Sequence, residues 1–354
     1  MPVQGLVKLR RHLFGWQGTT MNTPVAAKRA YPFTGVPSVD LQWTDPEVDA
    51  GSIDPTAPPY RLAGDFTASL DDPALKYNNL PLMLGAALAE TVAPTTTGTS
   101  EAWHWAPASL TVEPRDVFTY EFGDDVLTDW YQLSDGLLET LEITGSRDPD
   151  GPLTATMAWR FGTAQSTGST DSPVTGTVPT PGLAVALNDV MLYLKDGAIY
   201  IASDPDDLDT SQISDALHAF TLRITNTYDQ KRYANGEQTF NIDAYALTER
   251  MIELECRFAK TDDTVGTGSE SDAWFSDDSV NRYIQMIFTS TAEADTAIPY
   301  SWQFTAPMRY YTREEDAIGG NTIIVLTAHA FYDSDDLEEV FETDLVNTID
   351  ETGI

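Results

Sequence analysis

Apolar and polar residues alternate with a period of two over most of the chain, which is the pattern of half-buried β-strands. The alternating segments are short and are separated by Gly, Asp, Asn and Pro, which favours antiparallel sandwiches or barrels over a parallel α/β sheet. Asp196-Gly197, between two short apolar runs, is typical of a two-residue hairpin turn. The segments predicted to be strands are Leu62–Leu70, Phe118–Phe122, Leu137–Thr144, Leu153–Phe161, Val190–Leu194, Phe220–Tyr228, Phe240–Leu247, Ile252–Phe258, Tyr300–Thr305 and Thr322–Tyr332.

Two segments repeat apolar residues at helical spacing instead and predict one helix in each half of the chain. Asn79–Glu90 begins with an Asn cap and an early proline, and its apolar side chains fall on one face: Leu80, Met83, Leu84, Ala87 and Leu88. Ser279–Ser290 follows two aspartates and places a similar set on one face: Val280, Tyr283, Ile284, Ile287 and Phe288.

Residues 163–182 are dominated by Thr, Ser, Gly and Pro, which indicates a linker or a long surface loop between two halves. The length of 354 residues agrees with about two domains of ~150 residues each. We therefore predict a mainly β fold with two antiparallel β-sandwich or barrel units, each flanked by one helix. The expected boundaries are a basic N-terminal arm at 1–33, a first unit at 34–162, the linker at 163–182, a second unit at 183–347 and an acidic tail at 348–354.

Two short sequence echoes support related halves. Trp103–Pro107 resembles Trp302–Pro307, and Ser134–Thr144 resembles Ser214–Thr225. The order of the two motifs is reversed between the halves, whereas a tandem duplication keeps the order. Two related units with shifted boundaries and chance similarity both stay open.

The chain has 20 Lys plus Arg against 55 Asp plus Glu, a formal net charge of −35, which argues against a basic face that binds DNA by sequence. Residues 1–39 carry five bases and no acid, so the remainder carries −35 − 5 = −40. A basic arm is attracted to the acidic body of another copy, so these bases are predicted inter-subunit contacts; an unstructured terminus is the alternative. The five bases are Lys8, Arg10, Arg11, Lys28 and Arg29.

An acidic chain with only six lysines also suits molar salt, where self-repulsion is screened, so a halophilic source is one interpretation and an acidic protein from an ordinary host is the other. The single cysteine, Cys256, excludes an intrachain disulfide, and its place in an alternating strand predicts a buried apolar role. The longest apolar stretch, Leu80–Ala89, is too short to span a membrane.

The usual signatures of catalysis and metal binding are missing from the sequence. No two of the four histidines lie within four residues, and the phosphate-loop, dinucleotide and nucleophile-elbow motifs do not occur. His104 alternates with Trp103 and Trp105 and is expected at the surface. Three Asp-rich loops lack the ligand spacing of a calcium loop, and 55 acids permit too many pairs for a glycosidase dyad to be singled out. The prediction is no enzyme, no metal and no cofactor.

The order of elements carries a resemblance. Ile298–Phe304, a loop with Gly319-Gly320, the strand Asn321–Tyr332 and the closing Leu345–Asn347 form the C-terminal part. This part is preceded by the segment Phe220–Tyr228 with Asn235-Gly236. Earlier in the chain come Ala63–Glu90 and then Ser109–Glu113. Over roughly residues 30–347 this order resembles the major tail tube proteins of long-tailed, siphovirus-type viruses of bacteria or archaea.

The resemblance implies a β-sandwich flanked by a helix, assembled into rings that stack as the tail tube of a virion. A ring would consist of three two-unit chains or of six chains. The resemblance also implies contacts with terminator, tape-measure and distal tail proteins. Double-stranded DNA would pass through the tube without sequence recognition. An acidic wall agrees with that role, because it repels DNA. The alternative class is a carbohydrate-binding or adhesive β-sandwich on a virion or cell surface, for which eight tryptophans and 15 tyrosines supply stacking groups.

Overall fold

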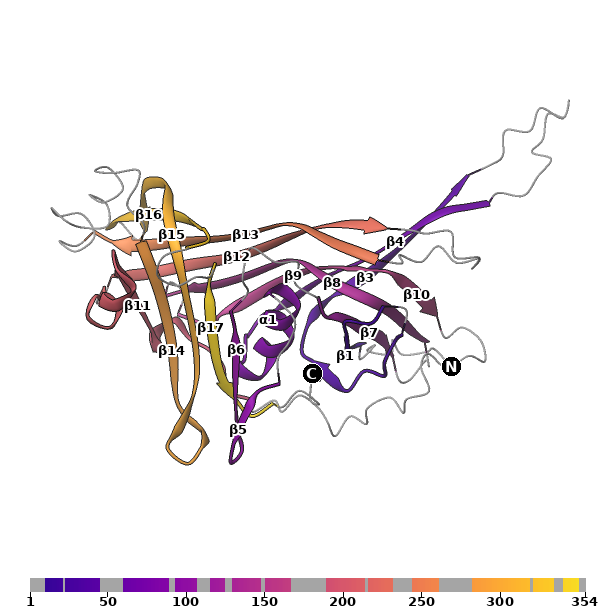
Figure 1. Ribbon diagram of the computed structural model, residues 1–354, viewed down its shortest axis with the longest axis horizontal. Helices are drawn as coiled ribbons and strands as arrows, with labels where there is room; N and C mark the ends of the chain where they lie inside the picture. Colours follow the sequence, from indigo (N-terminus) through magenta and orange to yellow (C-terminus); the bar gives the residue numbers. More distant parts are fainter. Residues whose placement is uncertain are drawn as a thin grey trace, which may run out of the picture.

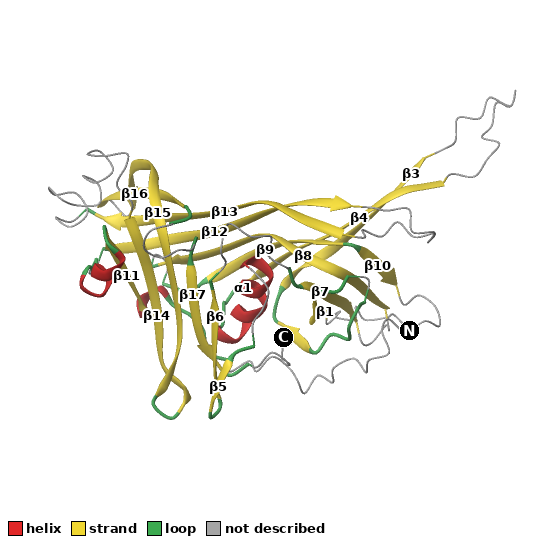
Figure 2. Cartoon of the chain, viewed as in Figure 1, coloured by secondary structure: helices red, strands yellow, loops and turns green. Residues whose placement is uncertain are grey.

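The computed structural model describes residues 10–21, 23–44, 60–88, 93–106, 115–124, 129–147, 150–166, 189–213, 216–231, 244–260, 282–318, 321–333 and 340–349. Within these residues the chain is mainly β, and the named strands join in one antiparallel network (Figures 1 and 2). The prediction of a mainly β, antiparallel fold is confirmed at this level. None of the helices in these ranges is long and apolar enough to cross a membrane.

Hydrogen bonding divides the network into three groups of strands that share two long strands. Strand β15 (Ile298–Ile318) pairs through its first half with β14 and β17 and through its second half with β16. The first group runs β5 (Thr95–Thr97), β6 (Ser100–Trp105), β17 (Glu342–Asn347), β15, β14 (Arg282–Asp295) and β11 (Gly197–Ala202).

The second group begins at the other half of β15 and forms the long sheet across the top of Figure 1. It runs β15, β16 (Asn321–Ala330), β13 (Ala244–Ala259), β12 (Leu217–Lys231), β8 (Asp129–Ser146), β9 (Thr154–Phe161), β4 (Tyr60–Asp72) and β3 (Thr34–Thr44). The third group uses the first half of β8 and contains β10 (Thr163–Ser166), β7 (Val117–Asp124), β1 (Arg10–Gly18) and β2 (Arg29–Tyr31).

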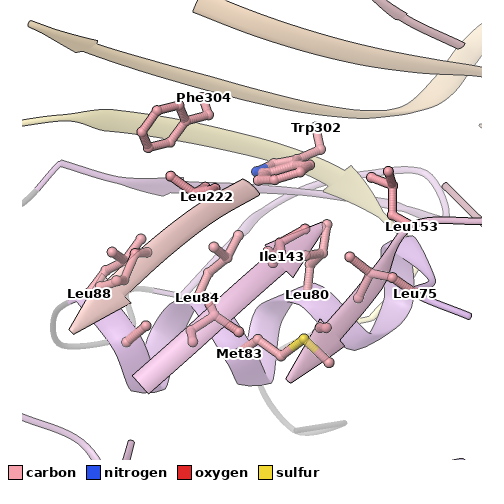
Figure 3. Packing of buried hydrophobic residues seen from close by; sticks show 14 of the residues in the cluster. Leu75, Leu80, Met83, Leu84, Leu88, Ile143, Leu153, Leu222, Trp302 and Phe304 are labelled. Atoms are coloured by element: carbon pink, nitrogen blue, oxygen red, sulfur yellow. The ribbon is translucent and has the colours of Figure 1, made fainter. Parts of the chain in front are cut away.

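The core lies between the first and second groups and around the only α-helix of the described residues, α1 (Leu80–Leu88). Phe220 of β12 meets Phe288 of β14 at a ring-centroid distance of 5.6 Å, and Phe288 stacks on Trp302 of β15 at 5.3 Å. Every residue of α1 is buried, and Leu80, Leu84 and Leu88 point toward β8, β12 and β15 (Figure 3). A helix that is apolar on all sides belongs inside a core, so α1 is more enclosed than the one-faced pattern predicted. The short 3₁₀ helix η1 (Tyr77–Asn79) leads into it.

The predicted helix at Ser279–Ser290 is wrong, because its described part belongs to strand β14. The apolar residues of this segment satisfy both periods: Ile284, Met286 and Phe288 also alternate and enter the core together. β-Branched and aromatic side chains favour the strand, and β11 and β15 supply hydrogen-bond partners along both of its edges. The prediction of one helix in each half is therefore also wrong for the described residues, in which α1 is the only α-helix.

Two further local predictions need correction. Val190–Leu194 forms isolated bridges at Met191 and Tyr193 rather than a strand. Asp196-Gly197 is not a hairpin turn, because Leu194–Asp196 is the 3₁₀ helix η3 and β11 begins at Gly197. The other predicted strands overlap observed strands; the first residues of Phe240–Leu247 lie outside the described residues, as does most of 163–182 beyond β10.

The two halves of the sequence are interleaved in space. β12 pairs with β8, and β17 lies between β6 and β15, so each half contributes strands to the first and second groups. One buried cluster contains residues from both halves. The echoed segments become neighbours: Thr221 lies opposite Thr144 in the antiparallel β8–β12 pair, while Trp103 and Trp302 face Leu345 from either side.

The N-terminal segment belongs to this body from residue 10 onward, which corrects the prediction of an extended arm over 1–33. β1 pairs with β7 and β2, and both Leu13 and Phe14 are fully buried. Gln17 holds the bend of β8, where Asp135 has a φ of 58°: its Nε2 donates to Asp135 Oδ1 at 2.7 Å, and its Oε1 accepts from the Asp135 N–H. Strand β1 therefore contributes buried side chains and hydrogen bonds to the body of the protein and is not a free extension.

Asn226 on β12 connects the helix to the sheet. Its Nδ2 donates to the carbonyl of Ala87 in the last turn of α1 at 2.8 Å and to that of Leu138 at 3.2 Å, and the side chain is buried. Asn226→Leu keeps the approximate volume but removes the donor, so we expect a loss of about 1–3 kcal/mol in the free energy of unfolding. Urea denaturation measures it. Thr227→Val on the exposed side of the same strand should stay within about 0.5 kcal/mol, and equal effects of the two variants would contradict this role.

Candidate functional site

The five predicted contact residues of the N-terminal segment lie in different environments. Arg29 is buried, and its Nη2 lies 3.3 Å from Asp189 Oδ2 of the same chain, so it is not available to a neighbouring subunit. Asp189 also accepts from Asn78 Nδ2 at 3.2 Å, which ties this pair to η1. Lys28 is exposed. Arg10 and Arg11 lie in β1, and Lys8 lies outside the described residues.

The exposed side of the long sheet carries a cross-strand row of charges that sequence reasoning missed. Arg223 of β12 lies opposite Glu142 of β8 and Glu253 of β13, and Glu253 lies opposite His329 of β16. The Arg223 guanidinium donates to Glu142 Oε2 at 2.6 Å and to Glu253 Oε1 at 3.0 Å, and His329 Nε2 lies 3.1 Å from Glu253 Oε2. The hydrogen bond to Glu142 is the main cause that raises the pKa of Arg223. The row extends to Tyr311, whose ring stacks on His329 at 4.3 Å.

Further ion pairs continue this arrangement on both sides of the row. Arg160 pairs with Glu139, and Arg257 pairs with Glu255 and Asp316. These side chains are partly exposed, so each pair contributes only about 0–1 kcal/mol to stability. Their effect is on the surface: this side of the sheet mixes both signs and is not a uniform acidic wall.

A cluster of exposed acid lies instead in the connection between β11 and β12. The 3₁₀ helix η4 (Pro205–Thr210) with its cap presents four exposed aspartates: Asp204, Asp206, Asp207 and Asp209. Asp204 caps η4 by accepting from the Asp206 N–H at 3.0 Å, which agrees with a solvated turn. The other two Asp-rich loops, at 148–151 and 333–336, are described only in part, because residues 148–149 and 334–336 lie outside the described residues.

The residues considered for chemistry sit as follows. Cys256 is buried in β13, and burial raises the pKa of its thiol, which agrees with the apolar role predicted for it. His12 is buried and its Nδ1 lies 2.8 Å from the Tyr120 hydroxyl, whereas His104 is exposed between two buried tryptophans, as its alternation predicted. Four tryptophans belong to the core, namely Trp103, Trp105, Trp159 and Trp302. The large exposed apolar residues are scattered over different strands and form no aromatic row in the described residues: Val36, Tyr131, Met251 and Tyr311.

A two-stranded ribbon projects from the body beside β9 (Figure 1). β4 pairs with β9 only from Phe66 to Asp72, and β3 pairs with β4 alone among the described strands. The ribbon formed by 40–44 and 60–65 therefore has no described partner along either edge. An isolated two-stranded ribbon is marginally stable in water, and exposed edges are templates for pairing with another chain.

The class of protein that this geometry defines is a mainly β protein built on a large antiparallel sheet with a projecting ribbon. No family model and no curated protein sequence matches the chain.

Proposed function

We propose that this chain is a structural subunit of a viral tail tube of the long-tailed type, which self-assembles into rings stacked around a channel for double-stranded DNA. The projecting ribbon is the observation that carries the proposal. Its open edges offer backbone donors and acceptors that a neighbouring copy can satisfy, and repeated head-to-tail contacts of this kind generate rings and filaments.

The charge supports the same proposal. At −35 the chain repels DNA phosphates, so a duplex can pass without being trapped. The exposed side of the long sheet, where arginines stand between glutamates, is the less suitable channel wall. The exposed base Lys28, together with Lys8, Arg10 and Arg11, stays a proposed contact with the acidic surface of another copy.

Electron microscopy of the purified full chain tests the proposal, in about 0.1 M salt and again in about 2 M salt, where screening removes most self-repulsion. We expect regular tubes, and more of them at the higher salt if the acidic composition is an adaptation to it. Counting subunits per ring decides between three and six chains. Dispersed monomers at both salt concentrations would contradict the proposal.

A ribbon variant makes the test specific. Asp40 lies opposite Asp65, so replacing residues 41–64 by Asn-Gly closes the ribbon with a two-residue turn. We expect this variant to keep the cooperative unfolding of the full chain and to lose its tubes. Tubes that form as before would show that the ribbon is not the contact, because the body of the protein is the same in both chains.

A further inference from the structure

A histidine and two carboxylates meet on the exposed side of the β6–β17 pair, away from the long sheet. His104 of β6 lies directly opposite Asp344 of β17, and Glu342 stands two residues before Asp344 on the same side of its strand. His104 Nδ1 is 2.8 Å from Asp344 Oδ1 and 3.8 Å from Glu342 Oε1. One ligand atom from each residue lies within 4.8 Å of the other two.

The three side chains stand on rigid elements. The other side of β6 carries Trp103 and Trp105, which are buried and stack on each other at 5.5 Å with an interplanar angle of 2°. Thr343 and Leu345 alternate with the two acids and are fully buried. Strands fixed in this way hold a set of ligands more firmly than loops do.

Electrostatics supports a bound cation. Glu342 and Asp344 bring two carboxylates together, with one oxygen of each within 4.8 Å of the other. Two carboxylates so close repel each other, and a divalent ion between them would replace this repulsion with attraction. The His104 side chain is 56% exposed and the acids 35% and 44%, so the group is open to ions from solution.

We propose that His104, Glu342 and Asp344 bind a divalent transition-metal ion of the Zn²⁺ class. Imidazole nitrogen and carboxylate oxygen are ordinary zinc ligands, whereas Mg²⁺ and Ca²⁺ prefer oxygen alone. Tetrahedral coordination at about 2.0–2.2 Å places ligand atoms about 3.4 Å apart, which small side-chain rotations achieve from the present distances. Water fills the remaining position. The ion links two strands that are about 240 residues apart in sequence, through residues 104 and 344.

The neighbouring strand adds a polar flank. Gln303 of β15 lies opposite Asp344, on the other side of β17 from His104. Its side chain is half-buried and stands on the same side of the sheet as the three proposed ligands. The carboxamide can hydrogen-bond a ligating carboxylate, the kind of support that orients ligands around metals.

Isothermal titration of ZnCl₂ into the full-length protein, freed of metal with EDTA and kept in excess Mg²⁺, tests the proposal. The Mg²⁺ occupies weak sites among the many other carboxylates. We expect one equivalent of zinc to bind and to raise the unfolding temperature. His104→Gln and Asp344→Asn should each weaken zinc binding by at least about tenfold. Removing a residue that only supports a metal ligand already weakens binding about 10–100-fold, and these two residues are proposed as ligands themselves.

His329→Gln is the matched control, since His329 is also a partly exposed histidine beside a glutamate but belongs to the charge row on the long sheet. It should bind zinc like the natural chain. Denaturation without metal shows whether each variant still folds, so loss of binding is separable from loss of structure. Failure of the natural chain to bind zinc, or equal binding by His104→Gln and Asp344→Asn, would overturn the proposal. The outcome does not depend on whether tubes form.

Discussion

Removing residues 1–30 will unfold this protein, whereas removing residues 1–9 will leave its unfolding transition in place. The longer deletion takes away β1, with the fully buried Leu13 and Phe14, and leaves β7 paired on one edge only, with β8. The ring of Phe14 packs against the rings of Tyr120 and Trp159, at centroid distances of 4.8 and 5.1 Å. Truncating such a side chain costs about 3–5 kcal/mol, against a total stability of about 5–15 kcal/mol for a typical domain.

Urea denaturation followed by tryptophan fluorescence measures both deletions. Phe14→Ala is the milder version and should lower the free energy of unfolding by about 3–5 kcal/mol, while Lys28→Ala, at an exposed position nearby, should change it by less than about 0.5 kcal/mol. A chain lacking residues 1–30 that unfolds at the same urea concentration as the full chain would contradict the placement of β1. The result also decides how the basic residues are tested: charge reversal at Lys28 is informative, and deletion of the whole segment is not.

Trp302→Ala will destabilise the protein by about 3–5 kcal/mol, because it empties the contact between β14, β15 and β17. Trp302 is fully buried, stacks on Phe288 with an interplanar angle of 14°, and donates from Nε1 to Thr343 Oγ1 at 3.0 Å. The residue therefore supplies both packing and a satisfied polar atom in the core shared by the two halves of the chain.

Thr343→Val separates these two contributions. It removes the acceptor for the indole N–H while keeping the volume, so we expect a loss of about 1–2 kcal/mol. Val36→Ala, at a position 52% exposed, is the neutral control. Equal losses for Trp302→Ala and Thr343→Val would mean that the hydrogen bond, not the packing, dominates at this position. Near-ultraviolet circular dichroism reports whether the aromatic packing survives in each variant.

Hydrophobic periodicity predicted most of the strands, since a side-chain period of two follows from the geometry of any strand. It failed where one apolar set satisfied two periods. Ile284, Met286 and Phe288 alternate, yet Val280, Tyr283, Ile284 and Ile287 also fit a helix. The strand is favoured over the helix because β14 has a hydrogen-bond partner on each edge. One partner, β11, is distant in sequence, and the other, β15, follows β14 directly.

The N-terminal segment shows a second limit. Its five bases suggested an arm, because charge is visible in sequence and pairing is not. β1 meets β7 more than 100 residues later, with His12 opposite Phe122, and Arg29 finds Asp189 160 residues away. The charge row and the His104 group have the same origin: each depends on strand register, and a shift of one residue would turn the side chains to the opposite side.

By itself the sequence determined the class of fold, the buried helix near residue 80, the apolar role of Cys256, the exposure of His104 and a net charge of −35. These properties are local or additive, so they follow from the order of residues and their count. The tertiary structure alone decided which strands became neighbours, how the two halves interleave, and which charges face one another. Those depend on contacts between residues far apart in the chain, where the free energy is set by packing and register together and no short segment contains both partners.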